Sequence, residues 1–163
     1  MTIYQQHQTN LITTMTSLPQ TIRWNAGELY LLDQTKLPIE VIEEKQESVE
    51  QVWDSIKQLK VRGAPAIGVA GAYGLLVAIR EQTALNKKEL LQEIEVKAEY
   101  LDSARPTAVN LKWALNRMLK SAKTFSRDDS KALYRHLEEE AIRIHEEDVQ
   151  LCLKMGINAV LLI

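Results

Sequence analysis

The segment that organises this chain begins Arg62-Gly63-Ala64-Pro65-Ala66-Ile67-Gly68 and continues without another charged side chain to Ile79. Proline is tolerated in the first turn of a helix, where its missing N–H would have no partner within the helix. The segment therefore predicts a helix that opens at Pro65. Because this helix is apolar all round, we expect it to be buried on every side.

Three glycines, Gly68, Gly71 and Gly74, recur at a spacing of three along this helix. A glycine inside a helix costs about 0.5–1 kcal/mol relative to alanine. Close packing against another helix or backbone would explain that cost. A glycine-rich dinucleotide loop would instead lie between a strand and a helix. We therefore interpret the three glycines as packing positions.

The residues before this helix predict a small antiparallel three-stranded sheet. Asn25-Ala26-Gly27 supplies a turn between two strand-like runs, 22–24 and 29–32, and Pro38 precedes a third run, Ile39 to Ile42. The residues after Ser48 predict a mainly helical domain, which makes the expected fold class α+β.

From Ser48 onward the apolar residues recur at helical spacing. Ser48 is a candidate N-cap for a first helix, whose apolar face is expected to extend to Leu59. Later helices are expected over 87–101, from Pro106 onward, and over 129–155. The last of these has an apolar stripe formed by Leu133, Leu137, Ala141, Ile144, Leu151 and Met155.

Length and charge restrict the class of protein. A chain of 163 residues can form one core-bearing domain, and its formal net charge of −2, with both signs well mixed, is not typical of nucleic-acid binding. The apolar run over 63–79 is shorter than the roughly 20 residues of a membrane span. With a single cysteine and no signal-peptide pattern, we expect a cytoplasmic protein that binds neither nucleic acid nor membrane. Residues 1–17 predict a flexible extension ahead of a domain over 18–163.

The start of the apolar helix is suited to binding an anion. The N–H groups around Gly63 and Ala64 lie at the positive end of the helix dipole, and Arg62 adds a fork of donors suited to phosphate. Arg105-Pro106-Thr107 repeats the arrangement, with an arginine before a proline that we expect to open a helix. Two such starts in one small domain indicate a shared ligand, a phosphorylated small molecule.

The same residues carry a resemblance to a known family. The stretches 62–68 and Ala104 to Leu115 resemble motifs of the methylthioribose-1-phosphate isomerases, and Leu18 to Trp24 and Leu32 to Pro38 are similar to the opening segment of that family. The motifs come in the expected order. The same superfamily includes ribose-1,5-bisphosphate isomerases and the regulatory subunits of a translation-initiation exchange factor, whose motifs are less similar.

The resemblance implies an aldose–ketose isomerase of methionine salvage, which converts 5-methylthioribose 1-phosphate to 5-methylthioribulose 1-phosphate without a cofactor or a metal. It implies that Arg62, Gly63, Ala64 and Arg105 hold this sugar phosphate. Val61 stands where the family often has a second basic residue, so only Arg62 is carried over there. The full-length family is expected to form homodimers.

The resemblance also implies that catalytic residues are missing. The family places its catalytic cysteine and aspartate in a Rossmann-like C-terminal domain, and no residue of this chain matches either position. We therefore expect the chain to be the N-terminal part of the isomerase, truncated before that domain and inactive alone, with its oligomeric state open. A ribose-1,5-bisphosphate isomerase, which needs extra basic residues, and a non-catalytic exchange-factor subunit, which predicts degraded anion-site motifs, remain as alternatives.

Other chemically distinctive residues are interpreted as structural. His136 and Glu140 are four residues apart and His145 precedes several acids, but a zinc site would need further ligands, so we favour a solvated acidic face. Cys152 falls on an apolar helix face and is interpreted as core packing.

Two features stay open. Asn110, Trp113 and Arg117 form a polar-aromatic stripe near the expected anion-binding end, which is equally compatible with an ordinary half-exposed face. Asp148 falls on the apolar stripe of the last helix, either paired with a cation at an interface or on a face that the domain leaves open.

Overall fold

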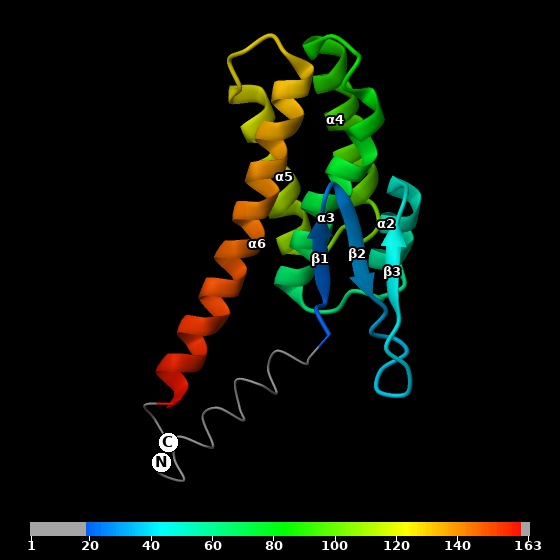
Figure 1. Cartoon of the computed structure of the whole chain (residues 1–163), viewed down its shortest axis with the longest axis vertical. Coiled ribbons are helices and arrows are strands. Elements are labelled where there is room, and N and C mark those ends of the chain that lie inside the picture. The colour runs from blue at the N-terminus through cyan, green and yellow to red at the C-terminus, as the bar shows by residue number, and fades with distance from the viewer. Residues whose placement is uncertain (1–18, 161–163) are drawn as a thin grey trace.

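The computed structural model describes residues 19–160, so the flexible extension expected over 1–17 lies outside the described residues. Within this range the order is β1 (Ile22–Asn25), β2 (Glu28–Leu32), β3 (Glu43–Gln46), α2 (Val49–Lys57), α3 (Ala64–Ile79), a short 3-10 helix (Arg80–Gln82), α4 (Lys87–Asp102), α5 (Val109–Thr124) and α6 (Ser130–Val160). The antiparallel sheet has the order β1-β2-β3. It lies against one side of the helices, with α3 behind it (Figure 1). This is the predicted α+β arrangement.

The predicted hairpin between β1 and β2 is confirmed. Asn25 pairs with Glu28, which leaves Ala26 and Gly27 as a two-residue turn. Both turn residues have a positive φ, 50° at Ala26 and 81° at Gly27, as a tight hairpin turn requires.

The third strand is not where the apolar residues predict it. The expected strand Ile39 to Ile42 lies in the connection between β2 and β3, and β3 instead comprises Glu43–Gln46. The connection folds back on itself, because Ile39 donates its backbone N–H to the carbonyl of Lys36. The three charged residues of β3 form ion pairs with Arg23 of β1, Glu28 of β2 and Lys60 after α2. β3 is an edge strand, and edge strands often carry charged side chains. A search for apolar residues therefore does not identify it.

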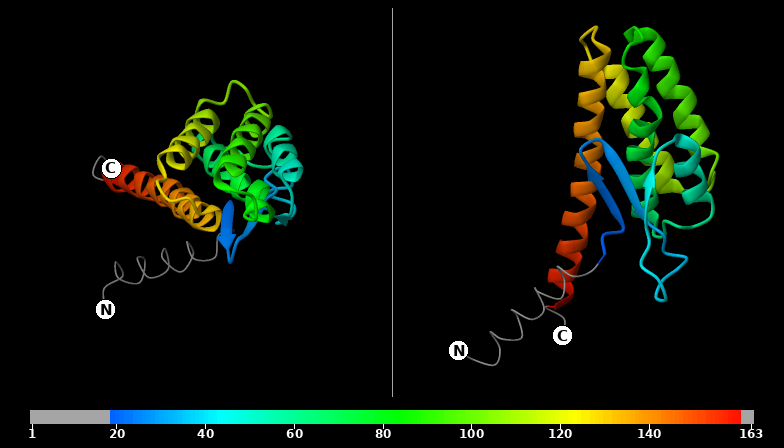
Figure 2. Two further views of the ribbon diagram at one scale, coloured as in Figure 1. Left: turned by 90° about the horizontal axis from the view of Figure 1, so that it is seen from above. Right: turned by 45° about the vertical axis from the view of Figure 1, so that its right-hand side comes forward.

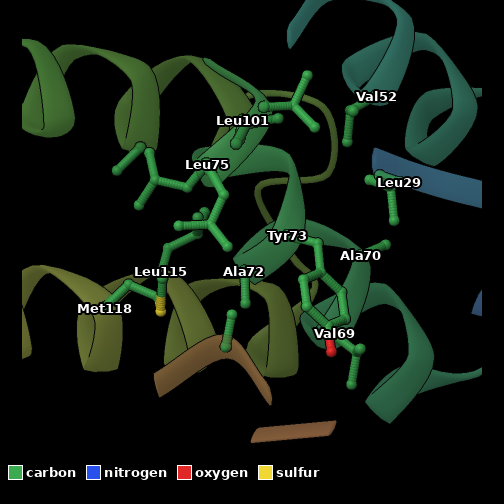
Figure 3. Packing of buried hydrophobic residues seen from close by; sticks show 14 of the residues in the cluster. Leu29, Val52, Val69, Ala70, Ala72, Tyr73, Leu75, Leu101, Leu115 and Met118 are labelled. Atoms are coloured by element: carbon green, nitrogen blue, oxygen red, sulfur yellow. The ribbon is translucent and has the colours of Figure 1, made fainter. Parts of the chain in front are cut away.

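α3 is the core helix, as predicted. Nearly all of its residues from Ile67 to Ile79 are buried. Side chains of four other elements surround it, among them Leu29, Val52, Leu101 and Leu115 (Figure 3). By length and composition α3 with its 3-10 extension would suffice to cross a membrane, but 67% of its most apolar window is buried inside the fold. The protein core therefore explains its composition.

The glycines of α3 allow close packing, as predicted. A Cβ atom at Gly68 would lie 2.8 Å from the carbonyl oxygen of Asn110 in α5, and one at Gly74 would lie 2.6 Å from a methyl carbon of Val52 in α2. Gly71 also faces α5. Since α3 approaches two neighbouring helices this closely, larger residues at these positions would force the helices apart.

Three of the helices have a side-chain cap at the N-terminus. Ser48 caps α2, Asn86 forms a capping box at α4, and Asp129 accepts a hydrogen bond from a backbone N–H in the first turn of α6. Leu59 follows the end of α2 with a φ of 60°. Leu59 is therefore not part of α2, and the prediction that it continues the apolar face of this helix is wrong.

α6 is longer than predicted and projects past the rest of the fold (Figures 1 and 2). Its first half buries the predicted stripe as far as Ile144. Leu151 and Met155 are exposed, and so is Cys152. The interpretation of these three residues as core is wrong, because helical periodicity identifies an apolar face but not the presence of a neighbour to cover it.

Candidate functional site

The N-terminus of α3 is exposed and has no side-chain cap. Its N-cap, Gly63, has a φ of 102°, a conformation that favours glycine. Neither Gly63 nor Ala64 has a polar side chain that could bond the first N–H groups of the helix. Arg62 is exposed beside this turn and donates from Nε to the carbonyl of Leu59 at 3.3 Å. Its other guanidinium nitrogens have no protein partner among the described residues.

The N-terminus of α5 differs from the prediction. Pro106 does not open the helix. It lies in a turn in which Ala108 donates its backbone N–H to the carbonyl of Arg105 at 2.9 Å, and α5 starts at Val109. Arg105 is therefore half-buried four residues before the helix, and the N-cap Ala108 again provides no side-chain acceptor. The predicted helix does follow Arg105, but the prediction that Pro106 opens it is wrong, because the proline lies in the preceding turn.

The fold brings these two helix starts together. Gly68, in the second turn of α3, packs on Asn110 in the first turn of α5, and Gly71 packs on Leu111 and Leu115 further along. The two helices therefore run in the same direction, with both N-termini at one end. α2, α4 and α6 have side-chain caps, whereas these two do not. Two positive dipole ends on one side of the molecule form a suitable site for an anion.

A cavity of about 460 Å³ opens between these two helix starts and α6. Its wall includes Pro65 and Val69 of α3, Val109 and Trp113 of α5, and Leu151 of α6. Small-molecule sites typically have volumes of about 300–1,000 Å³ and mostly apolar walls. We call this space the α3–α5–α6 cavity. It has the size and the composition of a ligand site.

None of the four residues expected to hold the phosphate is part of the wall of the α3–α5–α6 cavity. Ala64 directly precedes the lining residue Pro65, and Arg105 is four residues before the lining residue Val109. Sequence reasoning missed Val109 as a site residue. It is four residues before Trp113, so helical spacing could have added it to the polar-aromatic stripe.

Polar groups of α6 and α5 complete the cavity wall, namely Asn110, Glu147 and Asp148. Arg117 neutralises Glu147, with Nη2 2.8 Å from Oε1, and also donates to Glu140 at 2.5 Å. Hydrogen bonds to these two carboxylates raise the pKa of Arg117 against the effect of burial. Asp148 is half-buried and forms no ion pair with another described residue. Of the two alternatives for Asp148, the described residues therefore favour a helix face that the domain leaves open.

A second and larger cavity, of about 620 Å³, lies between β1, α3 and α6. In its wall Tyr73 stacks on Trp24, with ring centroids 4.9 Å apart, and the Tyr73 hydroxyl lies 3.2 Å from Nδ1 of His145. Burial raises the pKa of Tyr73 to about 12 and lowers the pKa of His145. Both groups are therefore neutral at pH 7. We regard them as a packed pair, and we place the candidate site at the smaller cavity because the two helix starts lie there.

The acidic face predicted around His136 and Glu140 is wrong. Glu140 is only 8% exposed and accepts hydrogen bonds from Arg117 and Arg143. Burial alone would raise the pKa of Glu140, but these hydrogen bonds outweigh it and lower that pKa. His136 lies 2.9 Å from the Ser121 hydroxyl. Over residues 19–160, no group of three or more His, Cys, Asp or Glu side chains is arranged to hold a metal ion.

Comparisons with known proteins identify what this arrangement resembles. Residues 60–163 match the model of the initiation factor 2 subunit family. A 5-deoxyribose 1-phosphate isomerase from Moorella thermoacetica is 44% identical over 83% of the chain. The crystal structure of 5-methylthioribose 1-phosphate isomerase from Pyrococcus horikoshii matches 86% of the chain with 41% identity and a TM-score of 0.81. The delta subunit of translation initiation factor eIF-2B from A. fulgidus matches 81% of the chain with 39% identity and a TM-score of 0.74.

The chain spans 38% of the Moorella protein, 39% of the Pyrococcus chain and 38% of the A. fulgidus chain. Two of these proteins are named as sugar-phosphate isomerases and the third as a subunit of an initiation factor. The two solved structures share the fold of this chain, although their named functions differ.

Proposed function

Because the chain belongs to the initiation factor 2 subunit family, we propose that it forms the phosphate-holding part of a sugar-phosphate isomerase. The proposed substrates are ribose 1-phosphates without a 5-hydroxyl group. They are 5-methylthioribose 1-phosphate, the substrate expected for methionine salvage, and 5-deoxyribose 1-phosphate. The reaction converts the aldose phosphate to the corresponding 2-ketose phosphate. No catalytic residue is assigned within this chain.

The observation that carries the proposal is the pair of uncapped helix starts with an arginine ahead of each. Arg62 and Arg105 are separated by 42 intervening residues in sequence, yet the helices that follow them pack together at their N-terminal ends. The exchange-factor alternative predicts degraded motifs at these two starts, and both arginines are present here. Retention of both arginines therefore favours the isomerase over the exchange-factor alternative.

Each proposed ligand-binding residue has a distinct role. Arg62 supplies a charged fork to the phosphate, since only its Nε has a protein partner among the described residues. Gly63 and Ala64 allow the phosphate to approach the backbone N–H groups of α3, because neither residue has a bulky side chain. Arg105 adds charge from the turn before α5.

The proposal is tested by phosphorus NMR of the purified chain with 5-methylthioribose 1-phosphate and with 5-deoxyribose 1-phosphate. We expect the phosphate signal to broaden or shift, and Arg62→Ala to weaken this binding by about tenfold or more, as loss of a charge-assisted hydrogen bond predicts. Arg127→Ala is the matched control, because Arg127 is an exposed arginine in the loop between α5 and α6.

The same spectra distinguish the alternatives. Binding of ribose 1,5-bisphosphate tighter than either 5-substituted substrate would favour the bisphosphate isomerase. Absence of any perturbation with all three sugar phosphates would contradict the isomerase proposal and favour a regulatory subunit. If ketose phosphate accumulates, the expectation that the chain alone is inactive is wrong.

A further inference from the structure

The outer face of α5 places an unusual amount of apolar surface beside the candidate phosphate site. Val109 is 77% exposed and Trp113 is 51% exposed, and both lie in the wall of the α3–α5–α6 cavity. Leu151, which is 56% exposed, faces the same space from α6. Burial of these three side chains against an apolar part of a ligand would be favourable. Their position calls for a ligand with an apolar end.

The wall of this cavity is held in place from behind. The guanidinium carbon of Arg117 lies 5.5 Å from the centroid of the Trp113 ring, a cation–π arrangement. Arg117 also bonds Glu147 and the buried Glu140, so it ties α5 to α6 beside the cavity. A ring fixed in this way forms a preorganised surface. The polar-aromatic stripe of α5, whose role the sequence left open, therefore has two parts. Asn110 and Trp113 line the cavity, and Arg117 supports them.

The cavity also has groups suited to the middle of a sugar phosphate. Asp148 of α6 is a half-buried carboxylate in the wall, and Asn110 of α5 provides an amide in the same wall. Carboxylate and amide oxygens accept hydrogen bonds from hydroxyl groups. The α3–α5–α6 cavity therefore combines donors for a phosphate at the nearby helix starts with hydroxyl acceptors and apolar side chains in its wall.

We propose that the α3–α5–α6 cavity receives the C5 end of the sugar phosphate and that Trp113, Val109 and Leu151 select an apolar C5 substituent over a hydroxyl. This inference rests on the proposed function. It assigns substrate specificity to residues that the phosphate-binding motifs do not include.

The test compares affinities of the chain for 5-methylthioribose 1-phosphate, 5-deoxyribose 1-phosphate, ribose 1-phosphate and inorganic phosphate by calorimetric titration. We expect 5-methylthioribose 1-phosphate to bind about tenfold or more tighter than ribose 1-phosphate, in line with other apolar specificity pockets. Trp113→Ala and Leu151→Ala should reduce this ratio to about threefold or less. Affinity for inorganic phosphate should be unchanged.

Leu153→Ala is the matched control for Leu151→Ala. Leu153 is on the same exposed part of α6 and is 48% exposed, but it does not line the cavity. Because Trp113 and Leu151 are about half exposed, their truncation should leave the fold intact, which circular dichroism would verify.

The outcomes separate the inference from the proposed function. If all sugar phosphates bind and their ratios are the same in the wild type, Trp113→Ala and Leu151→Ala, the specificity inference is refuted while the proposed function stands. If Leu153→Ala lowers the ratio as much as Leu151→Ala, the effect does not come from the cavity and the inference is again refuted. If no sugar phosphate binds at all, both fail together.

Discussion

Replacement of Gly68 by alanine tests the close contact that joins the two helix starts. A Cβ atom at this position would lie 2.8 Å from the carbonyl oxygen and 3.3 Å from the carbonyl carbon of Asn110. The obstacle is the backbone of α5, which cannot rotate away as a flexible side chain could. Overpacking of a core costs about 1–3 kcal/mol, while alanine in place of a helical glycine recovers about 0.5–1 kcal/mol. We expect Gly68→Ala to lower the free energy of unfolding by about 1–2 kcal/mol.

The assay is urea unfolding followed by circular dichroism. With a slope of about 2 kcal/mol/M, the middle of the usual range, the midpoint should fall by roughly 0.5–1 M with the slope unchanged. Gly156→Ala is the control, because a Cβ at Gly156 has no neighbour within 4 Å. That variant should match the wild type or gain up to about 1 kcal/mol from helix propensity.

A midpoint for Gly68→Ala equal to or above that of the wild type would refute the reasoning, because it would mean that α3 and α5 separate without cost. A second readout connects this contact to the site. Since the contact sets the distance between the two helix starts, phosphate binding should weaken in Gly68→Ala and remain unchanged in Gly156→Ala.

Three further predictions concern other parts of the fold. Ser48→Ala removes the N-cap of α2 and should lower the free energy of unfolding by about 1 kcal/mol in the same urea assay. Burial lowers the pKa of His145 below its ordinary value of 6.5, so the unfolded chain binds this proton more readily and stability should fall as the pH drops below about 6.5. In His145→Gln, the melting temperature should fall less between about pH 6.5 and 5 than it does in the wild type. An equal fall in both proteins would contradict the assignment of this pH dependence to His145. Arg117→Ala leaves the buried Glu140 with only Arg143 as a partner and should cost about 1–3 kcal/mol. Arg143→Ala should cost less, because Arg143 is half exposed and pairs within its own helix.

The elements that the sequence predicted correctly all depend on short-range effects. The turn at Ala26 and Gly27 follows from backbone conformation, the start of α2 follows from the hydroxyl of Ser48, and the burial of α3 follows from the absence of charge over one helix length. Each of these signals involves residues within a few positions of one another. The order of sheet and helices could therefore be predicted without knowledge of the tertiary structure.

The positions that the sequence predicted wrongly depend on distant neighbours. β3 begins at Glu43 rather than at Ile39 because the connection before it bonds to itself and because charged partners lie on other elements. Leu151 has the spacing of a core residue, but no described residue of this chain covers it. Apolar spacing reports which face of an element is apolar, and only the packing of other elements decides whether that face is buried.

The candidate site also has features that the sequence predicts and features that only the packing of helices creates. The sequence by itself indicated two helix starts that each follow an arginine and a proline, because proline and the helix dipole act locally. It placed the second start at Pro106, three residues too early. Only the tertiary structure decided that the starts of α3 and α5 lie together, since this depends on Gly68 packing against Asn110 across a sequence separation of 42 residues. It also decided that Trp113 forms a wall of the cavity, because that role depends on where α6 crosses α5.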